Sequence, residues 1–352
     1  MRPIRARVDS AALRHNLNVA KRRAPGSRVW AVVKANAYGH GLARAVRSLA
    51  GDGLALIELD AALELRGAGE KRPILLMQGF YSPQELEPIA RHGLTTVVHD
   101  AEQLAMLEKA RPPVKIPVYL KLNTGMNRLG FGEDGIRDAI ARLQRGAGEI
   151  TLMTHFADAD GKRGVKWQVE RFQEMTAGLK FARTLANSAA ILRYPETHAD
   201  WVRPVIMLYG CSPFSDESAE QLGLKPAMTL ASELIAVREL RAGDSVGYGC
   251  TFTATDPIRV GVVACGYADG YPRHAPIGTP ILVCGKRTRT VGRVAMDMLF
   301  ADLSGIPEAG VGSPVTLWGE GLSADEVAAS AGTVSYELLC ALSPRVPVSE
   351  TG

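Results

Sequence analysis

The chain has 352 residues, of which 46% are hydrophobic and 22% are charged. This composition is typical of globular proteins and excludes the disordered, collagen-like and disulfide-scaffold classes. The net charge of +4 is small for this length, and no long basic run occurs, so the sequence gives no indication of nucleic-acid binding. At about 150 residues per domain, the length predicts two domains, or a barrel-sized domain followed by a smaller one.

Neither a sorting signal nor a cysteine pair is visible in the sequence. The basic N-terminus becomes polar again at Arg14-His15-Asn16, before the apolar stretch of about 7–15 residues that a signal peptide needs. No run of about 18 apolar residues occurs, so we expect no membrane-spanning helix and a cytoplasmic location. The odd number of cysteines and the lack of a CxxC pair predict free thiols and no metal site: Cys211, Cys250, Cys265, Cys284 and Cys340.

Short apolar runs alternate with helix signals through the first two thirds of the chain. The runs are continuous and rich in valine, isoleucine and leucine, which is typical of parallel strands buried on both faces. We expect strands at residues 29–33, 54–59, 74–77, 95–99, 118–122, 150–154, a weak one before Thr197, and 202–209.

Helix signals lie between these runs. Ser82-Pro83-Gln84-Glu85 has the pattern of a capping box with proline at the first helical position, and Asp100 with Gln103 repeats the capping pattern. Apolar residues recur at helical spacing within 167–180. Eight successive strand–helix units predict an α/β fold over residues 1–226, a (β/α)8 TIM-type barrel whose seventh unit has the weakest signal.

The pattern changes near residue 226. Strands then alternate with glycine-containing turns, and we expect them at 233–240, 258–265, 280–283, 288–294, 299–303 and 315–317. A further capping box, Ser323-Ala324-Asp325-Glu326, and the segment 335–342 predict two helices. Residues 227–352 are therefore expected to form a C-terminal, mainly-β domain.

Polar side chains follow several of the predicted barrel strands, at the end where TIM-barrel active sites lie. They are Lys34, Lys121, His155 and Arg203. Position alone does not separate an active site from ordinary polar loops, and a lysine such as Lys34 can also extend into solvent. A buried lysine, in contrast, has a lowered pKa, and its neutral amine is a nucleophile. The loop 35–41 is rich in small residues and permits close approach of a ligand.

The segment Ala31-Val32-Val33-Lys34-Ala35-Asn36-Ala37-Tyr38-Gly39-His40-Gly41 closely resembles the pyridoxal-phosphate attachment signature of alanine racemases. Similar motifs follow in order along the whole chain, at 121–130, 153–157, Asn187-Ser188, Arg203-Pro204, 207–210, 246–249, 266–270, Met296-Asp297 and Tyr336-Glu337. The resemblance implies a barrel followed by a β domain, and an enzyme that depends on pyridoxal 5′-phosphate.

The resemblance implies that Lys34 forms an aldimine with the cofactor and acts as one catalytic base. Tyr248 is implied as the second base, on the opposite face, although a tyrosine between glycines would otherwise be an ordinary turn residue. A racemase needs two bases because one removes the α-proton and the other returns a proton from the opposite side. In the family this tyrosine comes from the partner subunit. The implied assembly is a head-to-tail homodimer acting on a small amino acid, without nucleic acid, membrane or metal.

Further cofactor contacts are implied residue by residue. Arg203 matches the arginine that faces the pyridine nitrogen, and because arginine only donates, that nitrogen stays unprotonated. His155 matches a histidine near Arg203 and Tyr248. Val205 departs from the family, which has glycine there, so its Cβ is expected to restrict the backbone or crowd the phosphate. The implied phosphate ligands are Tyr38, Ser188, the amides of Val205 and Ile206, and Tyr336.

The substrate contacts are implied in the same way. Arg128 matches the arginine that binds the substrate carboxylate, with help from the Met296 amide of the partner subunit, and Asp297 is expected to support it. Lys121 matches a lysine that is carbamylated in many relatives, where the new carboxylate orients Arg128; the alternative is a charged lysine paired with an acidic neighbour. The implied access corridor, narrowed by two tyrosines to favour a methyl side chain, contains Tyr267, Tyr336, Asp160, Arg273 and Arg293.

We therefore expect an alanine racemase that interconverts L- and D-alanine, for peptidoglycan synthesis or for alanine catabolism. The alternative is a broad-specificity racemase of the same fold that acts on serine, lysine or arginine. A pyridoxal-phosphate carrier without catalysis is disfavoured by the β domain, and a decarboxylase is disfavoured by Arg203, where it would need an acidic partner. His40, the other histidines and the cysteines are given no chemical role.

Overall fold

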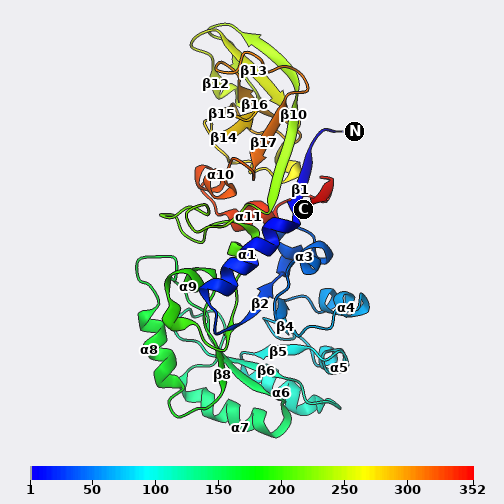
Figure 1. The fold of residues 1–352 in the computed structure, drawn as a ribbon, viewed down its shortest axis with the longest axis vertical. Helices are drawn as coiled ribbons and strands as arrows, with labels where there is room; N and C mark the ends of the chain where they lie inside the picture. The colour runs from blue at the N-terminus through cyan, green and yellow to red at the C-terminus, as the bar shows by residue number, and fades with distance from the viewer. Residues whose placement is uncertain (1) are drawn as a thin grey trace.

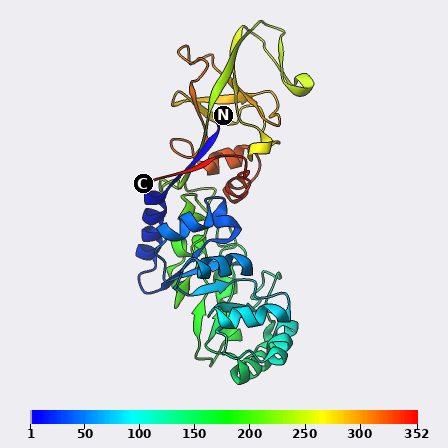
Figure 2. The same cartoon turned by 90° about the vertical axis from the view of Figure 1, so that its right-hand side faces the viewer.

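The computed structural model describes residues 2–352. A barrel and a mainly-β part are stacked along the long axis of the molecule, as Figure 1 shows. In the view turned by 90°, the C-terminus lies at the junction between the two parts (Figure 2). The expected fold class, a TIM-type barrel followed by a mainly-β domain, is confirmed.

Eight parallel strands close the barrel. The last strand pairs with the first, with Arg28 opposite Trp201 and Val29 opposite Val202. Most barrel strands are buried along their whole length, which explains their continuous apolar sequences. The strands are β2 (Arg28–Val32), β3 (Gly53–Leu56), β4 (Ile74–Leu76), β5 (Thr95–Val98), β6 (Val118–Lys121), β7 (Ile150–Met153), β8 (Ala182–Thr184) and β9 (Trp201–Val202).

Three of the strand predictions need correction. The seventh strand is β8, and the weak strand expected before Thr197 is wrong, because the 3₁₀ turn η3 (Pro195–Thr197) occupies that position. The run expected at 202–209 is a strand only in β9, since Pro204 has no N–H to donate and η4 (Ile206–Tyr209) follows it. The run expected at 54–59 ends at Leu56, because a helix begins at Leu59.

The capping predictions are met in part. Asp100 accepts a hydrogen bond from the Gln103 N–H at 2.8 Å, as expected for an N-cap. Ser82 makes no capping hydrogen bond and precedes the 3₁₀ turn η1 (Pro83–Glu85), so the prediction of a capping box at this position is wrong.

Within residues 2–352, no helix is long and apolar enough to cross a membrane. The barrel helices are α1 (Ser10–Arg23), α2 (Lys34–Tyr38), α3 (Leu42–Ser48), α4 (Leu59–Gly67), α5 (Leu86–Arg91), α6 (Ala101–Ala110), α7 (Ile136–Gly146), α8 (Lys166–Met175) and α9 (Ser188–Arg193), with the 3₁₀ turn η2 (Glu133–Gly135).

The C-terminal part contains an eight-stranded sheet in the order β13-β16-β15-β14-β17-β10-β1-β18, and a small sheet of β11 and β12. Two short helices, α10 (Ala324–Ser330) and α11 (Ser335–Cys340), lie beside the barrel (Figure 1). Its strands are β10 (Met228–Leu240), β11 (Ser245–Val246), β12 (Phe252–Thr253), β13 (Ile258–Val263), β14 (Pro280–Val283), β15 (Lys286–Val291), β16 (Leu299–Asp302), β17 (Pro314–Trp318) and β18 (Val348–Thr351).

One strand of this sheet comes from the start of the chain. β1 (Arg5–Asp9) pairs antiparallel with β10 and parallel with β18. The strand falls within the range 1–226 that was expected to form the barrel, yet its hydrogen bonds belong to the C-terminal sheet. The two ends of the chain are therefore neighbours at the junction.

The turn after β2 has an unusual backbone. Four successive non-glycine residues, Ala35 to Tyr38, have φ between 51° and 53°. A left-handed turn costs an L-residue about 1–2 kcal/mol, so the surrounding contacts must offset several such terms. One such contact is local: Asn36 Oδ1 accepts from the Leu42 N–H at 2.7 Å. The other is with α11, where a Cβ added to Gly39 would lie 2.1 Å from the carbonyl oxygen of Leu339, so only glycine fits.

His40 closes this turn. Its Nδ1 lies 2.8 Å from the Tyr38 carbonyl oxygen and 3.0 Å from that of Ala37, and because both are acceptors, Nδ1 carries the proton. The ring packs on Tyr209, with 4.7 Å between centroids, and the Tyr209 hydroxyl donates to the Val32 carbonyl at 2.8 Å. Burial lowers the pKa of His40 to about 4, so the side chain is neutral at neutral pH.

Acid should therefore destabilise the folded chain through His40. The unfolded residue has a pKa of about 6.5, so below that pH the unfolded state binds a proton that the folded state takes up only near pH 4. We expect this group to remove about 2 kcal/mol of unfolding free energy between pH 7 and pH 5. Urea unfolding at fixed protomer concentration should show a smaller loss in His40→Asn than in the native sequence, and an equal loss in both would contradict this role.

Candidate active site

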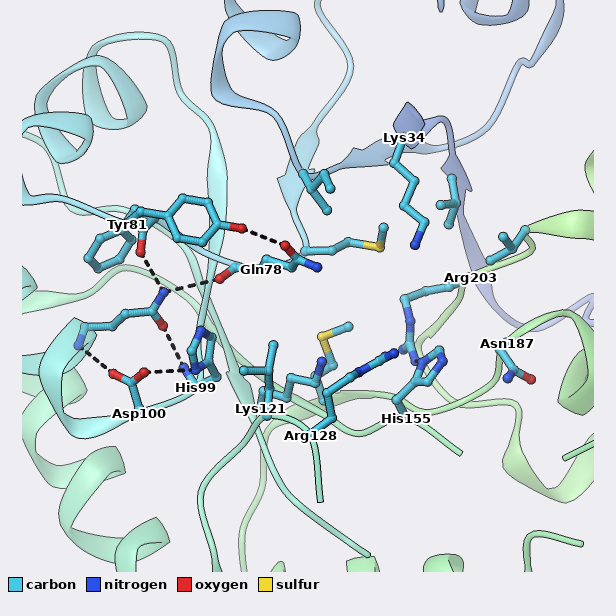
Figure 3. A pocket seen from close by; sticks show the side chains of 18 of the residues that line it. Lys34, Gln78, Tyr81, His99, Asp100, Lys121, Arg128, His155, Asn187 and Arg203 are labelled. Carbon is cyan, nitrogen blue, oxygen red and sulfur yellow. Dashed lines mark hydrogen bonds and ion pairs between the residues drawn. The ribbon is translucent and has the colours of Figure 1, made fainter. Parts of the chain in front are cut away.

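A cavity of about 600 Å³ opens at the carboxyl ends of the barrel strands (Figure 3). The four residues selected from the strand ends, Lys34, Lys121, His155 and Arg203, all line it. Each comes from a different strand: β2, β6, β7 and β9 end at or just before them. The rule that TIM-barrel sites form at this end of the strands explains why residues distant in sequence meet here.

The inner part of the cavity concentrates positive charge. Figure 3 shows Lys34, Lys121, Arg128 and Arg203 around one space. Burial, and then the nearby Arg128 guanidinium, lowers the pKa of Lys34. Burial, followed by repulsion from Arg203, lowers the pKa of Lys121 to about 8. Lys121 has no carboxylate within ion-pair distance among residues 2–352. This arrangement favours binding of anions.

Arg203 is held rigidly at the base of the cavity. Its Nη2 donates to the carbonyl oxygens of Thr154 at 2.8 Å and Leu185 at 2.9 Å, and its Nη1 donates to Thr184 Oγ1 at 2.5 Å. Burial lowers the pKa of Arg203 to about 10, so the guanidinium still carries its charge at neutral pH. Nε makes no hydrogen bond within residues 2–352 and is the guanidinium nitrogen left for a ligand.

His155 lies beside this arginine. Its Nδ1 is 3.5 Å from Arg203 Nη2. Burial, and then the positive charge of Arg203, holds the pKa of His155 well below its usual range. A neutral imidazole adds no further repulsion to a cavity that already holds four cations.

One edge of the cavity gathers small polar groups. Ser188 Oγ accepts from the Val205 N–H at 2.7 Å and lies 3.4 Å from the Met207 nitrogen. Val205 directly precedes η4, with φ of −124° and ψ of −100°. Ile206 is fully buried at the start of η4, and only its backbone N–H is a candidate contact for a ligand.

Two tyrosines complete this edge. Tyr38 comes from the left-handed turn and Tyr336 from α11, with 6.1 Å between the ring centroids. Burial raises the pKa of both hydroxyls, so they remain protonated and can donate. Asp160, expected in the access corridor, is exposed and close enough to Tyr336 to raise its pKa further.

These groups fit pyridoxal 5′-phosphate. Hydroxyl and amide donors match its phosphate, the unpaired Nε of Arg203 matches its ring nitrogen, and an amine with a lowered pKa matches its aldehyde. Within residues 2–352, no group of three or more His, Cys, Asp or Glu residues is arranged to hold a metal ion.

Several expected site residues lie away from this cavity. They are on the C-terminal part and point outward: Tyr248 is 72% exposed and Met296 is 52% exposed. Tyr248 begins the 3₁₀ turn η5 (Tyr248–Cys250), between Gly247 and Gly249, which both have positive φ. Arg293 packs against this turn, since a Cβ on Gly249 would lie 3.2 Å from its Nη1.

Tyr267 and Arg273 line a second cavity, of about 330 Å³, also on the C-terminal part. Asp297 is half-buried beside Met296 and accepts from Arg345 Nη2 at 2.7 Å. Within residues 2–352, no residue of the 240s, 260s or 290s lines the barrel cavity. Within one chain, the residues expected to contact the cofactor therefore lie together in the barrel cavity. The residues expected from the C-terminal part, such as Tyr248 and Met296, lie on a separate surface.

The outer part of the cavity contains polar residues that the sequence reasoning missed. The Tyr81 hydroxyl donates to Gln78 Oε1 at 2.6 Å, and His99 Nδ1 lies 3.1 Å from Asp100 Oδ2 (Figure 3). Burial lowers the pKa of His99, against the opposing effect of Asp100. Gln78 lies two residues after the end of β4, and His99 directly follows β5, so the rule that selected Lys34 also applies to them.

Comparison with known proteins agrees with this arrangement. Residues 8–213 match the family model "Alanine racemase, N-terminal domain", and residues 227–349 match "Alanine racemase, C-terminal domain". The alanine racemase of Paraburkholderia phytofirmans is 56% identical over 351 residues, covering 99% of both chains. That of Nitrosospira multiformis is 57% identical over 351 residues, covering 98% of both chains.

Solved structures give the same result. The biosynthetic alanine racemase of Pseudomonas aeruginosa superposes with a TM-score of 0.98, 48% identity and full coverage of both chains. The alanine racemase of Acinetobacter baumannii superposes with a TM-score of 0.95 at 38% identity, again with full coverage of both chains. The resemblance inferred from the sequence motifs is thereby confirmed, and the chain belongs to the alanine racemase family of isomerases.

Proposed function

We propose that this chain is a pyridoxal-phosphate-dependent racemase that interconverts L- and D-alanine, for peptidoglycan synthesis or alanine catabolism. The observation that carries the proposal is the shared cavity: the Lys34 amine, with its lowered pKa, faces the same space as Arg128 and Arg203. A lowered pKa increases the fraction of the amine that is deprotonated, and a deprotonated amine can act both as a nucleophile toward an aldehyde and as a base.

Cofactor binding would use the inner edge of the cavity. Tyr38, Ser188 and Tyr336 would donate to the phosphate, together with the amide of Ile206 and that of Val205, which would exchange its present acceptor, Ser188 Oγ, for a phosphate oxygen. Bound pyridoxal phosphate would supply the electron-withdrawing ring that makes the substrate α-proton acidic. Arg203 Nε–H would donate to the ring nitrogen and keep it unprotonated, because a guanidinium has no acceptor.

Substrate binding would use Arg128. A guanidinium binds a carboxylate through two parallel hydrogen bonds, which fixes the orientation of the substrate. Lys121 lies near it, with a pKa lowered to about 8 by burial and by Arg203, and no carboxylate of residues 2–352 lies within ion-pair distance of its amine. Carbamylation, in which the neutral amine adds carbon dioxide and releases a proton, would replace a repelling cation by a carboxylate that orients Arg128.

The second base would come from another copy of the chain. Tyr248 is exposed on the C-terminal part and does not line the cavity of its own chain. We propose a head-to-tail homodimer in which Tyr248 of the partner subunit faces Lys34 across the cofactor, and the partner's Met296 amide binds the substrate carboxylate. The partner's Tyr267, Arg273 and Arg293 would form the access corridor with Tyr336 and Asp160.

We further propose that the division near residue 226 separates the cofactor-binding barrel from the part that serves the partner's site, apart from β1. A cytoplasmic location would agree with the five unpaired cysteines, since reducing compartments keep thiols free.

The proposed function predicts a yellow protein in which borohydride attaches the cofactor to the peptide containing Lys34. Racemisation of a panel of L-amino acids should show alanine as the preferred substrate, because two tyrosines narrow the proposed corridor. A colourless protein would contradict the cofactor assignment, and equal rates on lysine or arginine would favour a broad-specificity racemase.

Tyr248→Phe should affect the two substrate enantiomers differently. Because Tyr248 would act on L-alanine and Lys34 on D-alanine, we expect exchange of the L-alanine α-proton to fall about 100-fold or more. Exchange from D-alanine should persist in the variant while racemisation is lost. Nuclear magnetic resonance in deuterated water measures both exchange rates, and equal losses for both enantiomers would contradict the assignment of faces.

Lys121→Ala tests the carbamate. Loss of the orienting carboxylate should leave Arg128 mobile and lower kcat/KM about 10-fold or more. A short carboxylate such as acetate should restore part of the activity by occupying the space of the missing side chain. A variant that keeps its activity, or that gains none from acetate, would contradict carbamylation.

A further inference from the structure

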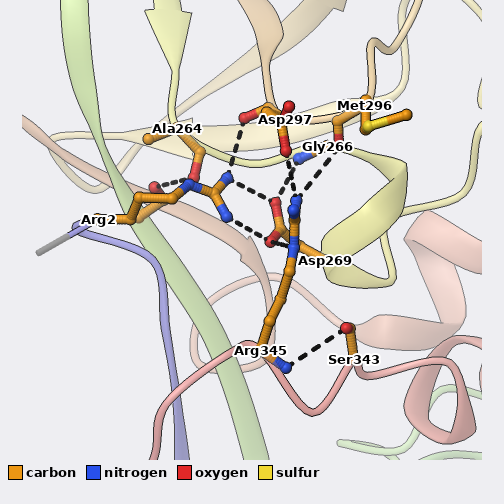
Figure 4. Close-up of polar contacts among 9 residues, drawn as sticks. Arg2, Ala264, Gly266, Asp269, Met296, Asp297, Ser343 and Arg345 are labelled. Atoms are coloured by element: carbon orange, nitrogen blue, oxygen red, sulfur yellow. Dashed lines mark hydrogen bonds and ion pairs between the residues drawn. The ribbon is translucent and has the colours of Figure 1, made fainter.

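Asp269 is a fully buried carboxylate on the C-terminal part, with 0% of its side chain exposed. It ends the 3₁₀ turn η6 (Tyr267–Asp269) and accepts four hydrogen bonds (Figure 4). Arg2 donates through Nη1 at 2.7 Å and Nη2 at 2.9 Å, Arg345 donates through Nε at 2.8 Å, and the Gly266 N–H donates at 2.9 Å. A buried charge is costly unless it is paired and hydrogen-bonded, and this one is fully satisfied.

The same two arginines reach a second loop. Arg345 Nη2 donates to Asp297 Oδ1 at 2.7 Å, and Arg2 Nη2 donates to the Asp297 carbonyl at 3.1 Å. Two arginines and two aspartates therefore form a neutral cluster that joins η6 to the segment around Asp297 (Figure 4).

Backbone contacts hold the two loops in one arrangement. The Tyr267 N–H donates to the Ala295 carbonyl at 3.0 Å, and the Ala268 N–H donates to the Met296 carbonyl at 3.0 Å. A Cβ on Gly266 would lie 2.3 Å from the Ala295 carbonyl oxygen, so this approach requires glycine. The carboxylate of Asp269 thus fixes the end of a turn whose start is already bonded to the Met296 loop.

The residues that this cluster supports are exposed. Tyr267 is 39% exposed and Met296 is 52% exposed, although the turn and the loop that carry them are held through the fully buried carboxylate of Asp269. The Met296 N–H makes no hydrogen bond within residues 2–352. Stabilisation of the fold does not require that an exposed tyrosine and an amide without a hydrogen-bond partner be held beside this cluster. Tyr267 and the Met296 N–H are therefore available to contact another molecule.

We propose that Asp269 is a positioning residue which, through Arg2 and Arg345, sets Tyr267 and the Met296 amide for the active site of the partner subunit. This inference rests on the proposed function, in which a second copy receives these two groups. Arg2 precedes β1 and Arg345 precedes β18, which pair with each other in the sheet. Both ends of the chain would therefore act on the partner's substrate site.

The test is the steady-state kinetics of Asp269→Asn in the dimeric holoenzyme. An asparagine amide cannot balance two arginines, so the Met296 loop should shift and weaken carboxylate binding. Because that contact is made in both the ground and transition states, KM should rise about 10-fold for both alanine enantiomers, with kcat changed much less. Arg2→Met, a milder change at a partly exposed side chain, should raise KM in the same direction.

Asp302→Asn is the matched control. Asp302 is a buried carboxylate on β16 that accepts from Arg289 Nε at 3.1 Å and from the Ser304 N–H at 3.0 Å, and it contacts neither loop. Its loss should lower the melting temperature while KM stays unchanged.

Three outcomes decide the proposal. A raised KM in Asp269→Asn and Arg2→Met, with unchanged cofactor absorbance, supports it. A native KM in an active Asp269→Asn or Arg2→Met enzyme would overturn it, as would an equal rise in Asp302→Asn, and Arg2→Met decides if Asp269→Asn does not fold. Failure of the proposed function itself would appear separately, as absence of racemisation in the unmodified protein.

Discussion

Confinement of four cations in one cavity is the constraint on which the site depends. Lys34, Lys121, Arg128 and Arg203 surround the same space, and because Lys121 and Arg203 are buried, little water screens the repulsion between them, whereas Arg128 is exposed. The barrel tolerates this because different strand ends anchor Lys34, Lys121 and Arg203, and Arg203 alone makes three strong hydrogen bonds to its surroundings. Anions relieve the repulsion. A phosphate, a substrate carboxylate and a carbamate on Lys121 would each do so, which links ligand binding to stability.

The C-terminal part has two roles in this account. On one side, α11 closes over the chain's own barrel: Tyr336 lines the cavity, and Leu339 lies against Gly39 of the turn that follows Lys34. On the other side, Tyr248 and Met296 project from rigid turns into solvent. One chain would therefore serve its own cofactor and its partner's substrate, and the dimer would be a condition of catalysis.

The barrel and the ring of strand-end residues could be predicted because both follow from local pattern: continuous apolar runs and the polar residues after them. β8 was missed because Ala182–Thr184 is short and has no apolar run. β1 was missed because its partners lie in the C-terminal third of the chain. The left-handed turn opposes local preference and depends on packing against two distant residues, Tyr209 and Leu339. The Asp269 cluster joins residues from both chain ends.

Mixing two inactive variants tests the central claim that a second copy completes the site. Lys34→Ala and Tyr248→Phe would each be inactive as a pure dimer. In a hybrid dimer, one site combines Lys34 of one chain with Tyr248 of the other and is fully native. Subunit exchange should therefore restore about one quarter of the native activity, because half of random dimers are hybrids with one intact site each. No recovery, despite hybrids detected by mass spectrometry, would contradict the account.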